Sequence, residues 1–200
     1  MGPAAGTRVL LGRAERQASI LEGAAAAFAR TGFSATSMED AAAAAGITKL
    51  IVYRHFGSKE DLYRAILQQV SDRLEEEFVA ALEHPDRRGV GARSLLTVAR
   101  ERPAGFVLLW RHAVREPQFA TYAAEHRRRA VAAARLLLGE GSDEVLQAWA
   151  AEALVSWLVE AVLAWLDAGD PARDDELLER VTAGLRAMRH AWVGPQGRTS

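Results

Sequence analysis

The chain has 200 residues, of which half are hydrophobic and 26% are charged, as in a globular protein with a buried core. It contains no cysteine, which excludes disulfide bonds, thiolate metal sites and a cysteine nucleophile. The formal net charge is −1, so any binding to nucleic acid has to come from a local basic patch. The first 13 residues lack the apolar core of a signal peptide, and the apolar stretch 153–166 is short and contains Glu160. We therefore expect a cytoplasmic protein with no membrane partner.

Helical periodicity and helix-stop residues divide the chain into nine helices, and no alternating stretch predicts a strand, so the expected fold class is all-α. Gly32 and Gly46 are expected to end helices in the left-handed conformation. Thr36 and Glu39 have the spacing of a capping box, and Thr48 is expected to cap the next helix. The predicted helices cover 13–31, 36–46, 48–56, 58–84, 93–101, 104–115 and 118–138, then about 25 residues opened by 142–143, then 170–192.

Residues 36–56 have the spacing of a helix-turn-helix motif. The small side chain of Ala42 lets the second helix cross closely, and Gly46 supplies the left-handed turn. Val52 is expected to pack back between the two helices. An alanine-rich helical hairpin can have this triplet by chance, so the flanking residues decide how the motif is interpreted.

With these flanks, residues 16–65 resemble the DNA-binding domain of the TetR family of bacterial transcriptional repressors. Leu50 departs from the pattern, because many family members have glycine there, so the family's operator sequences do not carry over. The resemblance implies a homodimer on a palindromic operator of double-stranded DNA, released when an effector moves the long fourth helix. The matching residues are Ile20, Leu21, Ala24, Phe28, Gly32, Phe33, Thr36, Ser37, Ala45, Gly46, Tyr53, His55, Phe56, Ser58, Lys59 and Leu62.

A recognition helix presents its exposed N-terminal residues to base edges in the major groove. Lys49 can donate to guanine, and Leu50 can contact a thymine methyl group. The resemblance implies that Tyr53 and His55 contact phosphates, the alternatives being a packing role for Tyr53 and a surface position for His55. Thr36, Ser37 and Lys59 lie at helix N-termini, which favour phosphates, the alternative for Lys59 being a solvated side chain. The predicted DNA-contacting residues are Thr36, Ser37, Thr48, Lys49, Leu50, Tyr53, Arg54, His55 and Lys59.

The middle of the chain collects large aromatic side chains with few charges between them. They are suited either to an ordinary core or to a cavity for an apolar or aromatic effector with one polar end. The histidines show neither metal-ligand spacing nor a partnered nucleophile, so we expect no enzyme activity, metal or cofactor. The predicted ligand-binding residues are Phe78, Phe106, Leu109, Trp110, His112, Phe119, Tyr122 and Trp149.

The last two helices carry more apolar surface than one subunit can cover. They are expected to pack on their copies across a two-fold axis as a four-helix bundle. The predicted interface residues are Trp157, Leu158, Val162, Trp165, Leu178, Val181, Leu185 and Met188.

These features predict a ligand-responsive transcriptional repressor built from four parts. They are a flexible arm (1–12), a helix-turn-helix domain (13–63), a regulatory ligand-binding and dimerisation domain (64–193) and a tail (194–200). Two alternatives stay open. One is a DNA binder of the same fold without an effector, and the other is a helical small-molecule-binding or scaffold protein whose N-terminal region docks a protein.

Overall fold

The structure of the protein, a computed structural model, describes residues 13–139 and 143–193. The expected arm (1–12) and tail (194–200) lie outside these residues. The described residues are helical and contain no strand, which confirms the all-α class. They form two compact units: the N-terminal unit, up to Ile66, and the C-terminal unit, from Leu67 onward. The sequence placed this boundary after residue 63.

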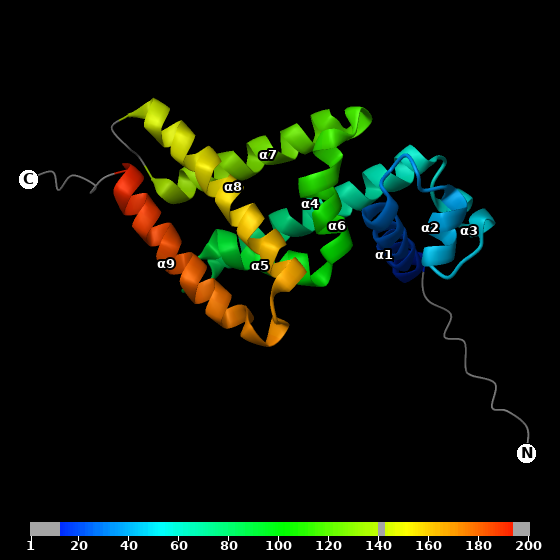
Figure 1. Ribbon diagram of the computed structural model, residues 1–200, viewed down its shortest axis with the longest axis horizontal. Helices are drawn as coiled ribbons and strands as arrows, with labels where there is room; N and C mark the ends of the chain where they lie inside the picture. Colours follow the sequence, from blue (N-terminus) through cyan, green and yellow to red (C-terminus); the bar gives the residue numbers. More distant parts are fainter. Residues whose placement is uncertain (1–12, 140–142, 194–200) are drawn as a thin grey trace, which may run out of the picture. The chain divides into compact units, whose positions relative to one another are not determined.

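Nine α-helices run through the described residues (Figure 1). Their order is the predicted one, and apart from α6 their ends lie within four residues of the predicted ends. Helix α4 contributes its first turns to the N-terminal unit and the remainder to the C-terminal unit. The helices are α1 (Arg13–Thr31), α2 (Met38–Ala44), α3 (Lys49–His55), α4 (Lys59–Glu83), α5 (Val90–Glu101), α6 (Pro103–Val107), α7 (Pro117–Leu138), α8 (Glu144–Ala168) and α9 (Asp174–Val193).

The helix predicted over 104–115 is divided in the structure. Helix α6 is followed by a π-helical segment, Leu108–His112, and a 3-10 turn, Ala113–Arg115. The amide of Ala113 donates to the carbonyl oxygen of Leu108, five residues back. This wider turn places Leu108 and Ala113 on one face, and both are fully buried. Burial of two residues five apart therefore accounts for the departure from regular helix.

The N-terminal unit is built on the inward face of α1. Ala24 and Phe28 on this face are fully buried. The ring of Tyr63, from α4, packs edge-on against Phe28 with 5.1 Å between centroids. Gly23 lies against the end of α2, where an added Cβ would come within 2.4 Å of the Cα of Ala45. The close crossing of α1 and α2 thus depends on Gly23, whose role was not predicted from the sequence.

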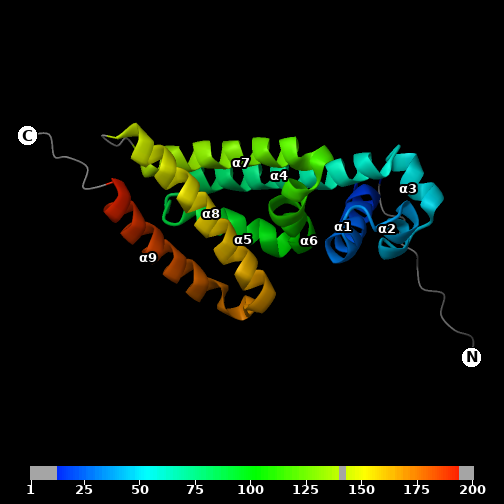
Figure 2. The same ribbon diagram turned by 45° about the horizontal axis from the view of Figure 1, so that its top comes forward.

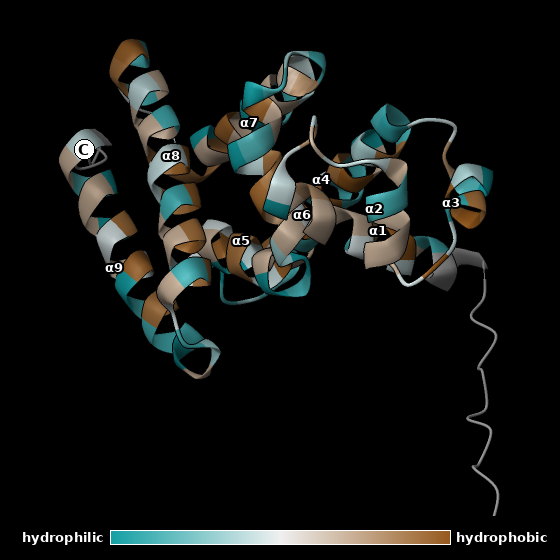
Figure 3. Ribbon diagram, turned by 45° about the vertical axis from the view of Figure 1, so that its right-hand side comes forward, coloured by the Kyte–Doolittle hydropathy of each residue, from teal (hydrophilic) through white to brown (hydrophobic). Residues whose placement is uncertain are grey.

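Helix α8 is the central helix of the C-terminal unit (Figure 2). By length and composition alone it could cross a membrane, but it packs against α5, α7 and α9. Apolar residues recur along the lengths of both α8 and α9 (Figure 3). The buried residues of α8 point in several directions, as expected for a helix that is apolar nearly all round. We therefore interpret α8 as a core helix.

A polar network joins three helices of the C-terminal unit. The guanidinium of Arg100 (α5) donates two hydrogen bonds to the carboxylate of Asp174 (α9), at 2.9 and 2.7 Å. The indole Nε1 of Trp165 (α8) donates to the same carboxylate at 2.6 Å. The neighbouring Arg100 holds the pKa of Asp174 below its usual value. The indole nitrogen of Trp165 is thus engaged inside the subunit, while its half-buried ring leaves the predicted place in a dimer interface as a prediction.

Candidate functional site

Helix α3 presents a mixed polar and apolar strip to solvent. Lys49 is exposed, as are Leu50 and Tyr53, whose exposed fractions are 66% and 44%. On the opposite side Val52 is fully buried, as predicted, and Gly46 in the preceding turn has a φ of 67°. Thr48 occupies the N-cap position, but its side chain makes no capping hydrogen bond. Its exposed hydroxyl is therefore available to a ligand of this strip.

The ammonium of Lys49 already has partners inside the N-terminal unit. It forms an ion pair with Glu39 of α2 and lies 5.6 Å from the ring centroid of Tyr53. The hydrogen bond between Lys49 and Glu39 raises the pKa of Lys49 and lowers the pKa of Glu39. A guanine read by Lys49 therefore has to compete with the Glu39 carboxylate.

The capping box of α2 is one residue later than predicted. Ser37 is the N-cap: its hydroxyl accepts from the amide of Asp40 at 3.1 Å, and the Asp40 carboxylate accepts from the amide of Ser37 at 2.9 Å. Thr36 is 1% exposed, and its hydroxyl donates to the carbonyl oxygen of Gly32 at 2.7 Å. Burial therefore removes the Thr36 side chain from the surface on which a phosphate contact was expected.

Lys59 is committed to the interior of the N-terminal unit. Its ammonium donates to the carbonyl oxygens of Phe33 and Thr36, at 2.9 and 3.0 Å. It also lies 4.4 Å from the centroid of the Phe33 ring, a cation–π contact. The adjacent Ser58 caps α4, accepting from the amide of Asp61 at 3.0 Å. Lys59 thus ties the loop between α1 and α2 to the start of α4.

Replacing Lys59 with alanine is expected to lower the free energy of unfolding by about 2–3 kcal/mol, because two carbonyl oxygens lose charge-assisted hydrogen bonds. Urea unfolding measures this loss. Arg64→Ala, an exposed change on the same helix, serves as the control and should stay within about 0.5 kcal/mol of the unchanged protein. If Lys59 only contacted phosphates, its replacement would leave the free energy of unfolding unchanged. The slope of log affinity for DNA against log salt concentration would instead fall by about one, the contribution of one phosphate contact.

The other predicted residues of α3 differ in exposure. Arg54 is exposed, and no ion pair involving it is found among the described residues. His55 is half-buried, with its ring centroid 6.3 Å from that of Phe56. Arg54 can therefore reach a ligand of the α3 strip more readily than His55.

The C-terminal unit contains a partly open cavity of about 440 Å³ between α4, α5, α7, α8 and the π-helical segment. This volume is within the usual range for small-molecule sites. Aliphatic side chains and alanines provide most of the lining, with Phe78 as one of its few aromatic residues. The lining residues used below are Leu74, Phe78, Gly91, Ser94, Trp110, His126, Arg129, Leu137, Leu154 and Leu158.

Three buried polar atoms of the cavity lining have no hydrogen-bond partner among the described residues. They are Nε1 of Trp110, Nε2 of His126 and Oγ of Ser94. The Trp110 and His126 rings meet edge to face, with 5.0 Å between centroids. Burial, with a smaller contribution from Arg129, lowers the pKa of His126 to about 4, so this histidine is neutral at pH 7. A ligand carbonyl or hydroxyl group would satisfy these covered atoms once the surrounding side chains moved aside to admit it.

Of the eight residues predicted to bind a ligand, Phe78 and Trp110 line this cavity. Phe106, Leu109 and Phe119 are fully buried in the core instead, because large rings filled the interior rather than framing a hollow.

The remaining three residues lie elsewhere. The hydroxyl of Tyr122 is hydrogen-bonded to Oε1 of Gln68 and to the hydroxyl of Ser71, at 3.1 and 3.0 Å. Trp149 is half exposed and packs on Trp192, and His112 is half-buried outside the cavity lining. The sequence prediction missed two polar residues of the cavity lining, His126 and Ser94. For His126 a signal was present, because a histidine within an alanine-rich helix face predicts a buried polar group.

The family model for bacterial regulatory proteins of the tetR family matches residues 20–66. The N-terminal unit belongs to the TetR family. The match covers the motif whose geometry is described above: α2, the glycine turn, α3 and the start of α4.

Two HTH-type transcriptional regulators are similar to about a third of the chain. The HTH-type transcriptional activator FasR of Mycolicibacterium smegmatis is 40% identical over 74 residues, which is 36% of this chain and 34% of FasR. The HTH-type transcriptional repressor Rv3405c of Mycobacterium tuberculosis is 41% identical over 63 residues, 32% of this chain and 34% of that protein. The match therefore spans about a third of each relative.

Solved TetR structures resemble the chain over most of its length. A TetR-like regulator from Rhodococcus sp. RHA1 has a TM-score of 0.75 at 23% identity, covering 92% of this chain and 100% of that one. AibR, in complex with isovaleryl coenzyme A and operator DNA, has a TM-score of 0.64 at 21% identity, covering 90% and 100%. These likenesses confirm the predicted fold, a helix-turn-helix domain followed by a helical C-terminal domain.

The residues predicted at a TetR-type dimer interface divide into two groups. Leu158, Val162 and Val181 are buried inside the subunit, so their side chains are not at a partner's surface, contrary to expectation. The others keep some exposure: Trp157 is 37% exposed, and the rest are half-buried, namely Trp165, Leu178, Leu185 and Met188. Among them Leu185 lies beside a groove described below.

Proposed function

We propose that the protein is a cytoplasmic, homodimeric transcriptional regulator that binds a palindromic DNA operator and releases it when a small effector binds. It acts as a repressor in this proposal, and it is not an enzyme. The exposed strip of α3 carries the proposal, because Thr48, Lys49 and Leu50 stand at the start of the helix that enters the major groove in such motifs. Tyr53 and Arg54 on the same helix can reach phosphates.

The relatives support regulation of transcription but leave its sign to experiment. FasR is named as an activator and Rv3405c as a repressor. AibR was solved with operator DNA and isovaleryl coenzyme A together. For this chain, the mostly apolar cavity with three unsatisfied polar atoms supports an effector with an apolar body and a hydrogen-bonding group.

Helix α4 supports the link between the effector and DNA. Its residues Leu74 and Phe78 line the cavity, while Lys59 at its start ties down the loop before α2. An effector that binds more tightly to one position of α4 therefore shifts the dimer toward that position. Because the spacing of the two recognition helices has to match the DNA helical repeat, such a shift changes the affinity for the operator. The effector can shift this equilibrium only by its differential affinity for the two states.

An electrophoretic mobility shift with the region upstream of the protein's own gene tests this function. We expect a specific complex whose affinity falls steeply with salt, because several phosphates are neutralised. Genomic fragments retained by the protein would define the palindrome. Failure to bind any genomic fragment tightly at low salt would contradict the proposal, and binding that no apolar compound releases would favour a regulator without an effector.

Changing Lys49 to alanine is expected to relax base preference at one position of each half-site by about ten- to a hundredfold, because one side chain reads one base pair. Glu39→Gln should strengthen binding up to about fivefold, since the lysine no longer has to leave an ion pair. Tyr53→Phe should instead weaken all sequences equally. Competition binding with single-base operator variants measures these effects, and a Lys49→Ala protein with unchanged preferences would remove Lys49 from the reading surface.

A further inference from the structure

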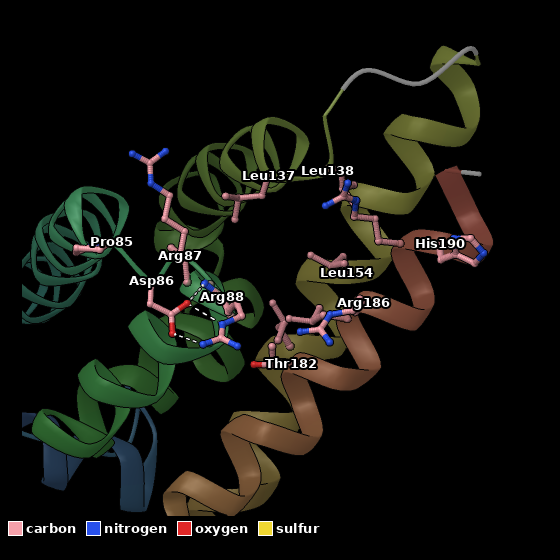
Figure 4. A pocket seen from close by; sticks show the side chains of 16 residues that line it. Pro85, Asp86, Arg87, Arg88, Leu137, Leu138, Leu154, Thr182, Arg186 and His190 are labelled. Carbon is pink, nitrogen blue, oxygen red and sulfur yellow. Dashed lines mark hydrogen bonds and ion pairs between the residues drawn. The ribbon is translucent and has the colours of Figure 1, made fainter. Parts of the chain in front are cut away.

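A second hollow, a groove of about 770 Å³, lies in the C-terminal unit between the start of α5, the ends of α7 and α9, and α8 (Figure 4). Four arginines line it, and Asp86 is the one acidic residue of its lining. Asp86 accepts two hydrogen bonds from the Arg88 side chain, at 2.9 and 3.0 Å. The groove therefore has a clear excess of positive charge. The other three arginines, Arg87, Arg186 and Arg189, have no ion pair among the described residues.

The arginines of α9 face the groove from one side of the helix. Thr182, Arg186 and Arg189 recur at three- and four-residue spacing, and all three line the groove. In Figure 4 the side chain of Arg186 lies on the side of α9 toward Asp86 and Arg88. Arg186 and Arg189 thus place two unpaired guanidinium groups about one helical turn apart at the groove, which suits them to phosphate oxygens that they can bind bidentately.

The groove and the effector cavity share part of their lining. Gly91, Leu137, Leu154 and Leu158 line both. Along α7, Leu137 at the groove comes eleven residues after His126, a rise of about 16 Å. The apolar cavity thus extends from the unsatisfied polar atoms near His126 to the arginine-lined groove.

We propose that the groove binds the phosphate-bearing head of the effector, whose apolar chain occupies the adjoining cavity. This inference rests on the effector cavity of the proposed function. The effector class is an apolar chain joined to a phosphorylated carrier, with the phosphates against Arg186 and Arg189. A carbonyl or hydroxyl group near the far end of the chain would meet Trp110 and His126.

Isothermal titration of the DNA-free protein with four octanoyl probes tests the inference. Octanoyl-coenzyme A and S-octanoylpantetheine carry the same thioester and differ in their phosphates, and octanoate lacks the carrier. An octanoyl lysophosphatidate carries a single phosphate on a lipid backbone. We expect the coenzyme A ester to bind at least about tenfold more tightly than the pantetheine ester, with a preference that shrinks as salt is raised. Tighter binding of the lysophosphatidate would identify a lipid as the source of the phosphate.

The arginine variants connect this preference to the groove. Arg186→Gln combined with Arg189→Gln is expected to remove the tenfold difference while leaving the binding of the uncharged S-octanoylpantetheine and the thermal stability unchanged, because both side chains are exposed and unpaired. Arg115→Gln is the matched control, an exposed arginine outside the groove and also without an ion pair, and should keep the preference. Equal affinity of the two thioesters for the unchanged protein would overturn the inference.

Failure of the inference is distinguishable from failure of the proposed function. The titration uses no DNA, so a protein that bound no operator could still show the phosphate preference. Conversely, a protein released from its operator by octanoate, with no gain from phosphates, would keep its function and lose this inference. If none of the octanoyl probes binds, the phosphate-binding groove is overturned together with the octanoyl-sized effector cavity.

Discussion

Replacing Ala187 with glutamate is expected to convert the dimer to a monomer and to weaken operator binding by about 10²–10⁴-fold, because the two half-sites are no longer bound together. Ala183 and Ala187 are exposed on α9, beside Trp157 of α8, whose ring lies against Gly184. Small side chains there allow a second copy to approach closely. A glutamate buried in that interface without a partner would cost several kcal/mol.

Ala124→Glu on α7 provides the matched control, since it also places a glutamate at an exposed helical alanine. Sedimentation velocity at micromolar concentration should show a dimer for the control and a monomer for Ala187→Glu. Helical content should be the same in both. A monomeric unchanged protein, or a dimer that survives Ala187→Glu, would contradict an interface on this face of α9.

The stability of the protein is expected to fall by about 3 kcal/mol as the pH is lowered from 6.5 to 4, through His126. Its pKa is about 4 in the folded state and near 6.5 when unfolded, so between these values the unfolded chain binds more protons. Stability is therefore full above pH 6.5 and is lost on acidification. The cause is the cost of charging an imidazole packed against Trp110, with Arg129 adding repulsion.

Urea unfolding at fixed protein concentration across this pH range measures the effect. His126→Gln should flatten the profile, because glutamine does not titrate. His112 also has a pKa lowered by burial, so His112→Gln is the comparison that separates the two histidines. The pKa of Asp174 is held below its ordinary value, so most of its contribution to stability is lost only below pH 4. An unfolding free energy that stays constant from pH 6.5 to 4.5 would contradict the predicted burial of a neutral His126.

The sequence by itself determined the class, the order of the helices and the family. These depend on local chemistry: apolar spacing of one helical turn, left-handed glycines such as Gly32 and Gly46, and caps such as Ser58. The exposed residues at the start of α3 were also predictable, because the inward position of Val52 sets which residues of this short helix face outward. Such features are encoded within a few residues of one another.

Only the tertiary structure decided what the side chains meet across the fold. Lys59 was expected at a phosphate and instead holds two carbonyl oxygens more than 20 residues away in the chain. Phe106 and Phe119 were expected around a ligand and fill the core. The cavity opened where alanines and medium-sized aliphatic residues of α4, α5, α7 and α8 meet. Residue type predicts that a side chain will be buried, but whether it fills a space or borders one depends on the packing of neighbours distant in sequence.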